Sequence, residues 1–317
     1  MTFVSKKIIK KKERYYLEES IRLPNSKVKK FSVYIKDYSP KNKYTKEKET
    51  LKEKINNARK EFAATYYKKD SIFTNTTLKK LEEIRIDYKQ ILKKLTKTQI
   101  KDILDRFTVN FTYESNAIEG NSLTLKDVTF IIKEGKILKN KDLREIYETL
   151  NTRKAMDLLF ENKLKINHKD IIKLHSTLIA NTGVAEGYKQ LPNFLLGRQV
   201  ETTPPEKVKR DMENLTSWYE KNKDLHPLQL ASIFHGKFEK IHPFEDGNGR
   251  VGRLLINVIL IENDYPPLII RKTQRIKYFA ALEAFDNKHP DKLHRFVLDK
   301  YKATHEKFFK IYIKYLD

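Results

Sequence analysis

The stretch Ile241-His-Pro-Phe-Glu-Asp-Gly-Asn-Gly-Arg-Val-Gly-Arg253 decides the organisation of this chain. Before it, residues 228–240 carry apolar side chains at helical spacing, and after it, residues 254–262 are apolar on nearly every side. This pattern predicts a helix, a tight loop and then a buried helix. The loop would hold a histidine and an acid, and the first turns of the second helix would hold two arginines.

The residue types in this stretch suit the binding of a phosphate group. Gly247 and Gly249 allow positive φ and a close approach of the backbone to a ligand. A helix N-terminus presents unpaired N–H groups and the positive end of the helix dipole, and both favour anions. Arg250 and Arg253 lie three residues apart on that helix, and the guanidinium fork fits phosphate oxygens.

Two further side chains add chemistry to this anion site. Asp246 is placed to hold Mg²⁺, because that ion takes oxygen ligands from a carboxylate and a phosphate together. His242, neutral near pH 7, can take a proton from an incoming hydroxyl group. The stretch therefore predicts a site for attack on a nucleotide phosphate.

The run His-Pro-Phe-Glu-Asp-Gly-Asn-Gly-Arg-Val-Gly-Arg at 242–253 resembles the signature of Fic-domain proteins, with every fixed position filled. The resemblance implies an all-α Fic fold and the transfer of AMP from ATP, with Mg²⁺, to a serine, threonine or tyrosine hydroxyl of a target protein. It implies that His242 is the catalytic base and that Asp246 holds the magnesium. The phosphate cradle would consist of Gly247, Asn248, Gly249, Arg250 and Arg253.

A second, shorter motif lies earlier in the chain. Ser115-x-x-x-Glu119-Gly120 resembles the inhibitory motif of Fic proteins, which lies N-terminal to the core. In that family the glutamate pairs with the second arginine of the signature and blocks the productive position of the γ-phosphate. The resemblance implies a Glu119–Arg253 pair and an auto-inhibited enzyme. The alternative is an acidic helix end that Gly120 terminates.

Two other regions resemble nucleotide-binding parts of the family. Residues 187–203 interrupt the helical pattern where Fic proteins have a β-hairpin flap, and an ordinary surface hairpin is the alternative. Tyr278 and Phe279 resemble the aromatic residues that border the adenine, and core packing is the alternative for both. The nucleotide-facing positions of the flap would be Leu196, Gly197, Arg198 and Gln199.

The first part of the chain predicts a separate extension. Residues 13–36 contain two runs around a Pro-Asn-Ser turn and predict a β-hairpin. Residues 46–67 and 76–96 predict two amphipathic helices whose charged faces are solvated. We therefore expect an N-terminal extension over 1–96 and a Fic domain, including the inhibitory helix, over 97–317.

Composition limits the classes of partner. The net charge is +23, from 65 Lys and Arg against 42 Asp and Glu, and fits nucleic acid, an anionic membrane surface or an acidic partner. The excess is mostly lysine scattered through nearly every segment, without a zinc-finger or RNA-binding signature, so nucleic acid is not the expected partner. The chain has no cysteine, which excludes disulfides and thiol chemistry. Without a long apolar run or an apolar signal region, we expect no membrane span and a cytoplasmic protein.

Two alternatives to AMP transfer remain open at this stage. The first is another phosphate reaction at the same site, either removal of AMP from a modified protein or transfer of a different nucleotide. The second, from a different class, is a basic nucleic-acid-binding protein without catalysis. The sequence does not identify the target protein, and a homodimer is one assembly compatible with it.

Overall fold

The computed structural model describes residues 2–23, 27–193 and 201–316. By its internal contacts the chain divides into two compact units, one of Met1–Lys69 with Phe73–Ile86 and the other of Asp70–Ile72 with Asp87–Asp317. The division falls within helix α2 (Asn75–Lys94). The expected boundary between the extension and the Fic domain, at residue 96, stays a prediction.

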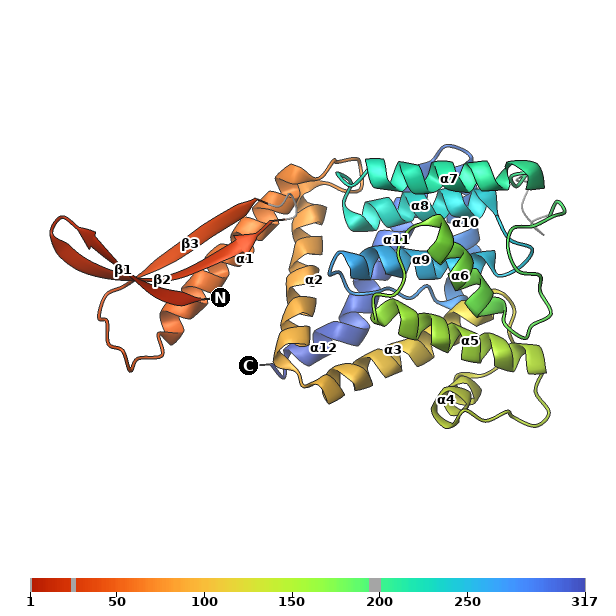
Figure 1. Cartoon of the computed structure of the whole chain (residues 1–317), viewed down its shortest axis with the longest axis horizontal. Helices are drawn as coiled ribbons and strands as arrows, with labels where there is room; N and C mark the ends of the chain where they lie inside the picture. Colours follow the sequence, from red (N-terminus) through yellow and green to blue (C-terminus); the bar gives the residue numbers. More distant parts are fainter. Residues whose placement is uncertain (1, 24–26, 194–200, 317) are drawn as a thin grey trace. The chain divides into compact units, whose positions relative to one another are not determined.

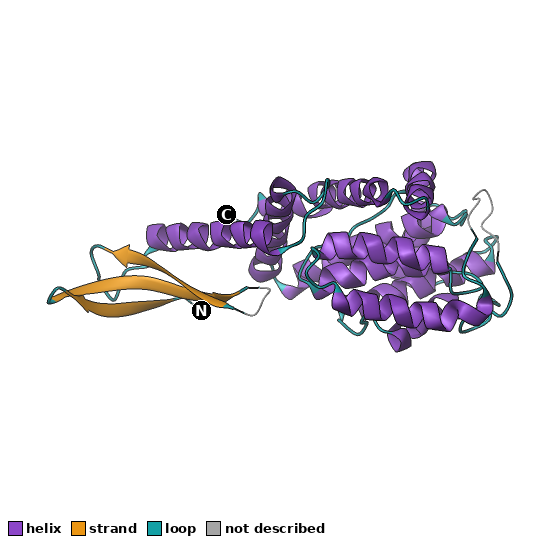
Figure 2. Cartoon of the chain, turned by 90° about the horizontal axis from the view of Figure 1, so that it is seen from above, coloured by secondary structure: helices purple, strands orange, loops and turns teal. Residues whose placement is uncertain are grey.

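The first unit contains an antiparallel sheet in the order β1 (Phe3–Ile9), β2 (Lys12–Arg22) and β3 (Val28–Ile35), shown in Figures 1 and 2. The predicted hairpin is confirmed by the pairing of β2 with β3. Strand β1 was not predicted. Its Lys6-Lys7-Ile8-Ile9 run has two polar residues followed by two apolar ones, so it lacks the alternation that indicates a strand.

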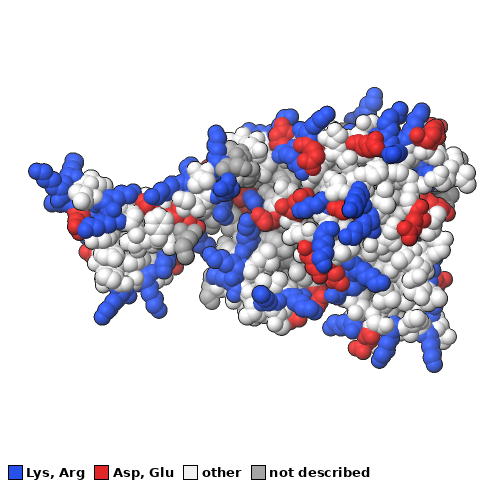
Figure 3. Space-filling model, in the orientation of Figure 1, with Lys and Arg blue, Asp and Glu red and all other residues white. Residues whose placement is uncertain are grey.

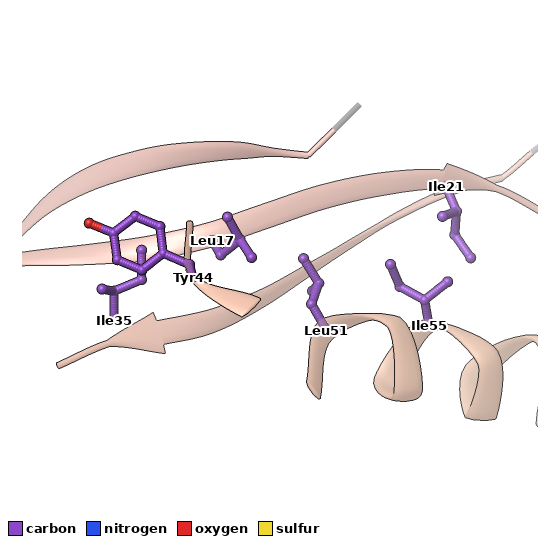
Figure 4. Close-up of a cluster of buried hydrophobic side chains, with 6 residues drawn as sticks. All are labelled: Leu17, Ile21, Ile35, Tyr44, Leu51 and Ile55. Carbon is purple, nitrogen blue, oxygen red and sulfur yellow. The ribbon is translucent and has the colours of Figure 1, made fainter. Parts of the chain in front are cut away.

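One face of this sheet packs against helix α1 (Thr45–Tyr66). Leu17 and Ile21, on the same face of β2, meet Leu51 and Ile55, which lie one turn apart on α1, as Figure 4 shows. Burial of these side chains holds the helix and the sheet together. The cluster consists of Leu17, Ile21, Ile35, Tyr44, Leu51 and Ile55.

The second unit is built from helices, so the predicted all-α class is confirmed for the part of the chain that carries the signature (Figure 1). The elements that surround the signature run in chain order from α3 to α12. They are α3 (Lys97–Ile118), α4 (Leu125–Glu134), α5 (Leu143–Phe160), α6 (His168–Ile179), α7 (Pro205–Lys221), α8 (Pro227–Ile241), α9 (Asn248–Glu262), α10 (Arg275–Asp286), α11 (Pro290–Thr304) and α12 (Lys310–Ile313).

Helix α9 lies at the centre of this unit and contacts α3, α5, α6 and α8. Every residue from Arg250 to Leu260 is buried, as the continuous apolar run predicts. A Cβ atom at Gly252 would lie 2.5 Å from Glu239 Oε1, so glycine allows α9 to approach α8 closely. Helix α9 has 15 residues, and no helix in the described ranges is long and apolar enough to cross a membrane.

The helix ends follow local sequence signals. The Thr124 side chain accepts a hydrogen bond from the Asp127 N–H at 3.2 Å, and the Asp127 carboxylate accepts one from the Thr124 N–H at 2.9 Å. These two bonds form a capping box at the start of α4. Helix α3 stops at Gly120, whose φ of 106° suits glycine, as predicted. The turn after α3 places Glu119 at the exact end of a helix that touches α9.

The expected β-hairpin flap lies between α6 and α7. Residues 187–193 and 201–203, which the structure describes, contain no strand. The four predicted nucleotide-facing positions, Leu196, Gly197, Arg198 and Gln199, lie outside the described residues.

Candidate active site

The turn between α8 and α9 has a defined backbone shape. His242 ends α8 in the left-handed region, with a φ of 50°, and its N–H group donates to the Phe238 carbonyl oxygen at 2.9 Å. A histidine with positive φ is uncommon, and such residues gather at functional sites. Gly247, with a φ of 83°, precedes the first turn of α9. The predicted helix, tight loop and buried helix are therefore confirmed.

Side chains beneath the loop hold it in place. Phe244 is fully buried and stacks on His175, with ring centroids 3.8 Å apart and planes at 4°. The Asn248 side chain donates to the Phe244 carbonyl oxygen at 2.8 Å and accepts from the Phe244 N–H at 2.9 Å. Asn193 donates to the same carbonyl oxygen at 2.9 Å. Asn248 thus closes the loop whose backbone faces the first turn of α9.

His175 of α6 also fixes the backbone of the acidic loop residue. Its Nε2 lies 3.0 Å from the Asp246 carbonyl oxygen. Burial lowers the pKa of His175 to about 4, so the ring is neutral near pH 7 and its Nε2–H donates this bond. His175 thus packs beneath the loop and also holds the loop backbone at Asp246.

Arg253 binds the end of α3. The side chain is 2% exposed, and its Nε and NH2 nitrogens reach Ser115 and Glu119. Nε donates to Ser115 Oγ at 3.0 Å, NH2 donates to the Ser115 carbonyl oxygen at 2.9 Å, and NH2 lies 2.7 Å from Glu119 Oε1. The contact that the motif predicts is present in the structure, while its inhibitory effect stays a prediction.

The Glu119 carboxylate lies against the first turn of α9. A Cβ atom at Gly249 would overlap Glu119 Oε1 and would lie 2.9 Å from Arg253 NH1. Glycine at this position therefore lets the carboxylate approach the helix N-terminus, where an anion is favoured. Glu119 thus sits as an internal anion in the part of the fold that the sequence assigns to a phosphate.

A ring of alternating charges surrounds Arg250, the first arginine of the signature. Arg250 NH1 lies 3.0 Å from Glu148 Oε1, and Arg250 NH2 lies 3.4 Å from Asp246 Oδ2. Arg144 of α5 closes the ring, since its Nε lies 3.5 Å from Glu148 and its NH2 contacts Asp246 directly. The sequence reasoning missed Arg144 and Glu148, because an arginine and a glutamate four residues apart on a helix normally indicate a solvated face.

These charged residues border a pocket of about 290 Å³. Acidic side chains from α3 and α5 outnumber the two arginines in its lining. Asp246 is 42% exposed, so its carboxylate is accessible to a ligand in this pocket. The described residues hold no group of three or more metal-ligating side chains. The donor set therefore fits Mg²⁺ that arrives with substrate phosphates, because a single carboxylate completes the coordination of such an ion. The pocket is lined by Glu119, Gly120, Asn121, Asp142, Arg144, Glu145, Glu148, Asp246 and Arg250.

The two aromatic residues predicted to border the adenine differ in environment. Tyr278 is fully buried, and its hydroxyl lies 2.8 Å from His235 Nε2, while the Arg253 guanidinium lies 5.9 Å from its ring. Phe279 is half-buried beside Arg275, whose guanidinium lies 5.0 Å from the ring. Tyr278 thus has the contacts of a packing residue beneath the arginine, and the adenine-binding role of both rings stays a prediction.

The geometry is that of a helical unit in which Glu119 and Arg253 meet at the N-terminus of a buried helix, and comparison with known proteins shows which family it resembles. The Fic/DOC family matches residues 165–260. The protein adenylyltransferase Fic of Drosophila virilis is 34% identical over 198 residues, which cover 61% of this chain and 41% of that protein. The protein adenylyltransferase fic-1 of Caenorhabditis briggsae is 30% identical over 179 residues, which cover 54% and 35%. Residues 165–260 therefore match a Fic domain, and the aligned part of this chain spans about two-fifths or less of the length of these relatives.

Solved structures agree with this assignment. A Fic domain containing signaling protein from Bacteroides thetaiotaomicron superposes with a TM-score of 0.60 at 25% identity, covering 74% of this chain and 93% of that one. A Fic family protein from Desulfovibrio desulfuricans superposes with a TM-score of 0.61 at 25% identity, covering 76% and 75%. The Fic fold predicted from the signature is therefore confirmed.

Proposed function

We propose that this protein transfers AMP from ATP to a hydroxyl group of a target protein. The observation that carries the proposal is the filled signature at 242–253, folded as a loop that opens onto the N-terminus of α9 with Arg250 and Arg253 behind it. The curated relatives named above are protein adenylyltransferases, which supports the same activity here.

In this proposal each residue has a defined task. His242, on the rim of the loop, accepts the proton of the attacking serine, threonine or tyrosine hydroxyl. Asp246 would hold the Mg²⁺ that accompanies ATP, which would supply charge neutralisation at the phosphates. The backbone at Gly247 and Gly249 and the Arg250 guanidinium orient the phosphates for in-line attack. The new bond joins the hydroxyl oxygen to the α-phosphorus, and the bond to the β-phosphate oxygen breaks, so that pyrophosphate leaves.

The ring of charges around Arg250 has to rearrange for this reaction. Arg144 contacts Asp246, so a Mg²⁺ held by that carboxylate would displace the Arg144 guanidinium. Arg144 is half-exposed and can turn toward solvent or toward the phosphates. Arg250 is buried and stays against Glu148, which fixes its direction.

We further propose that Glu119 inhibits the enzyme. Its carboxylate holds Arg253, and it occupies the first turn of α9 at Gly249. ATP can then bind only with its γ-phosphate turned away from Arg253, and because positioning dominates phosphoryl-type chemistry, in-line attack fails. The wild-type protein is therefore nearly silent until Glu119 leaves.

The test measures auto-modification with labelled ATP in four proteins. Wild type should be nearly inactive, Glu119→Gly should be strongly active, and Arg253→Ala should be inactive. The double variant Glu119→Gly with Arg253→Ala decides the mechanism. If Glu119 acts by holding Arg253, the double variant is inactive. If it acts only by repelling phosphates, the double variant keeps most of the gain. Equal activity in wild type and Glu119→Gly would mean that the motif is only a helix end.

The same four proteins test the alternative reaction. Incubation of AMP-modified protein without ATP measures release of AMP, and other labelled nucleotides measure transfer of a different group. If the modified protein loses its AMP, and if this loss stops in Glu119→Gly, then removal of AMP is the main activity. The homodimer, the target protein and the cytoplasmic location stay predictions.

A further inference from the structure

The sheet of the first unit has two faces of different character. Alternation along the strands places Leu17, Ile21 and Ile35 on the face that packs against α1. The residues between them, such as Tyr16 and Glu18, lie on the opposite face, which turns away from α1 (Figures 2 and 4). We call this second face the open face, and it consists of the odd-numbered residues of β1 and the even-numbered residues of β2 and β3.

Basic residues are concentrated in this unit and on the open face. Its two segments contain 24 Lys and Arg against 10 Asp and Glu, so 83 of the 317 residues carry +14 of the net charge of +23. Figure 3 shows Lys and Arg side chains around the sheet. Within the described strands, the face toward α1 has two lysines and two glutamates, whereas the open face has one acid and five basic residues. The five are Lys7, Lys12, Arg14, Arg22 and Lys30.

This difference in charge between the two faces separates a binding surface from a general bias of composition, because a lysine-rich composition would place lysine on both faces equally. A bias of the whole chain would give each face the same excess of positive charge. Glu18, the acid of the open face among the described strand residues, is also neutralised. Its carboxylate lies 2.7 Å from Lys7 Nζ and 2.5 Å from Lys30 Nζ, and these lysines lower its pKa to about 2. The open face therefore presents positive charge with no free carboxylate.

Aromatic rings lie between these basic residues. Tyr16 and Tyr34 are directly opposite each other on β2 and β3, with ring centroids 5.5 Å apart. Tyr34 is 48% exposed, and Phe3 on β1 is 47% exposed. Basic groups flank these rings, with Lys7 Nζ 4.7 Å from the Tyr16 ring and the Arg14 guanidinium 5.9 Å from the Tyr34 ring. No packing requirement of the fold explains exposed rings on this face.

From these observations we infer that the open face binds single-stranded nucleic acid. Basic side chains on a sheet neutralise the phosphates, and exposed rings between them stack on unpaired bases, which is the combination that single strands require. A duplex hides the faces of its bases and gives the rings nothing to stack on. An acidic peptide uses the charge but has no bases to stack on the rings. An anionic membrane can use both the charge and the rings, so vesicles are included in the test below. The inference goes beyond AMP transfer and does not depend on the α8–α9 site.

The experiment measures fluorescence anisotropy of labelled RNA and DNA single strands of about 16 nucleotides. The full chain is titrated at several salt concentrations between about 50 mM and 200 mM. Lys12→Gln with Arg14→Gln removes two charges from the open face. Lys6→Gln with Lys29→Gln removes two charges from the face toward α1 and is the matched control. Tyr34→Ala removes a ring from the open face, and Tyr66→Ala, a partly exposed tyrosine on α1, is its control.

Each variant has an expected result. Loss of Lys12 and Arg14 should reduce the slope of log K against log salt by about 1.4, since each phosphate contact on a single strand contributes about 0.7. Tyr34→Ala should weaken binding about 5- to 100-fold, which is the range for loss of one stacked base. The two controls and His242→Ala should bind like wild type. Urea unfolding of each variant checks that the fold is unchanged.

Three results would overturn the inference. Equal losses from the two charge pairs would mean that binding follows net charge alone. Unchanged affinity in Tyr34→Ala would remove the role of the rings. Tighter binding of a duplex, of polyglutamate or of anionic vesicles than of either single strand would assign the face to another partner. Binding of either RNA or DNA single strands supports the inference. The ratio of the two affinities shows which of the two nucleic acids the face prefers.

Discussion

Replacing Glu119 by glutamine tests whether the Glu119–Arg253 pair stabilises the nucleotide-free protein. The substitution keeps the size of the side chain and removes its charge. Arg253 then stays buried at 2% exposure with hydrogen bonds to Ser115 but without an anionic partner. We expect Glu119→Gln to unfold more easily than wild type.

The size of the loss follows from the exposure of the two partners. Breaking a fully buried ion pair costs about 3–5 kcal/mol, and an exposed pair contributes about 0–1 kcal/mol. Here Arg253 is buried but Glu119 is 36% exposed, and Ser115 still binds two positions of the guanidinium. The glutamine oxygen can also accept a hydrogen bond. We therefore expect a loss of about 1–2 kcal/mol, between the two limits.

The assay is urea unfolding followed by the fluorescence of Trp218, which is the single tryptophan of the chain and lies in α7. Glu161→Gln is the matched control, because Glu161 is also the C-cap of a helix and pairs with Lys163 at 2.7 Å. Both partners of that control pair are more than half exposed, so its loss should be at most about 0.5 kcal/mol. A loss in Glu119→Gln no larger than in Glu161→Gln would refute the reasoning.

A second arm adds ATP with Mg²⁺ to both proteins. If a phosphate takes the place of the carboxylate on Arg253, nucleotide should stabilise Glu119→Gln more than wild type. Ligand at about 100 times its Kd adds about 2.7 kcal/mol to a protein that binds it only when folded. Equal stabilisation of the two proteins would show that Glu119 and the nucleotide do not compete.

Three further predictions concern the loop between α8 and α9. In the Glu119→Gly background, His242→Ala should retain ATP binding but transfer AMP about 100- to 10,000-fold more slowly. Auto-modification with labelled ATP measures this transfer, and a near-normal rate would exclude His242 as the base. Asp246→Ala should abolish the effect of Mg²⁺ on nucleotide affinity in calorimetry, and an affinity that still responds to EDTA would place the metal elsewhere. Because the folded pKa of His175 is about 4, below its usual 6.5, stability should be complete above pH 6.5 and fall by about 3 kcal/mol toward pH 4. His175→Phe should flatten this part of the curve, and an unchanged acid slope would contradict the assignment.

Much of the site could be predicted from the sequence because its signals are local. The apolar periods on either side of 241–253 define two helices, and the glycines between them define the turn. The capping box at Thr124 and the stop at Gly120 fix the end of α3 and the start of α4. Glu119 could be paired with Arg253 only through the family motif, because the two residues are far apart in the chain.

Other parts of the site could not be predicted, for physical reasons. Arg144 and Asp246 are 102 positions apart, and their contact depends on the packing of α5 against α9. Nothing in the sequence around Arg144 separates a pocket residue from a solvated one. The sequence of strand β1 does not alternate, and its pairing with β2 rather than its own pattern makes it a strand. The open face is visible only when three strands are aligned in register.

The burial of α9 has a consequence for the time scale of motion in this protein. Amide hydrogens from Arg250 to Leu260 are shielded by four other helices, so they can exchange with solvent only when the whole unit opens. Helix α4, with Leu125 and Phe130 about two-fifths exposed, can open by itself at a much smaller free-energy cost. We therefore expect the backbone that bears Arg250 and Arg253 to stay static, so that the switching proposed for Glu119 would occur through side-chain rotations and at the end of α3.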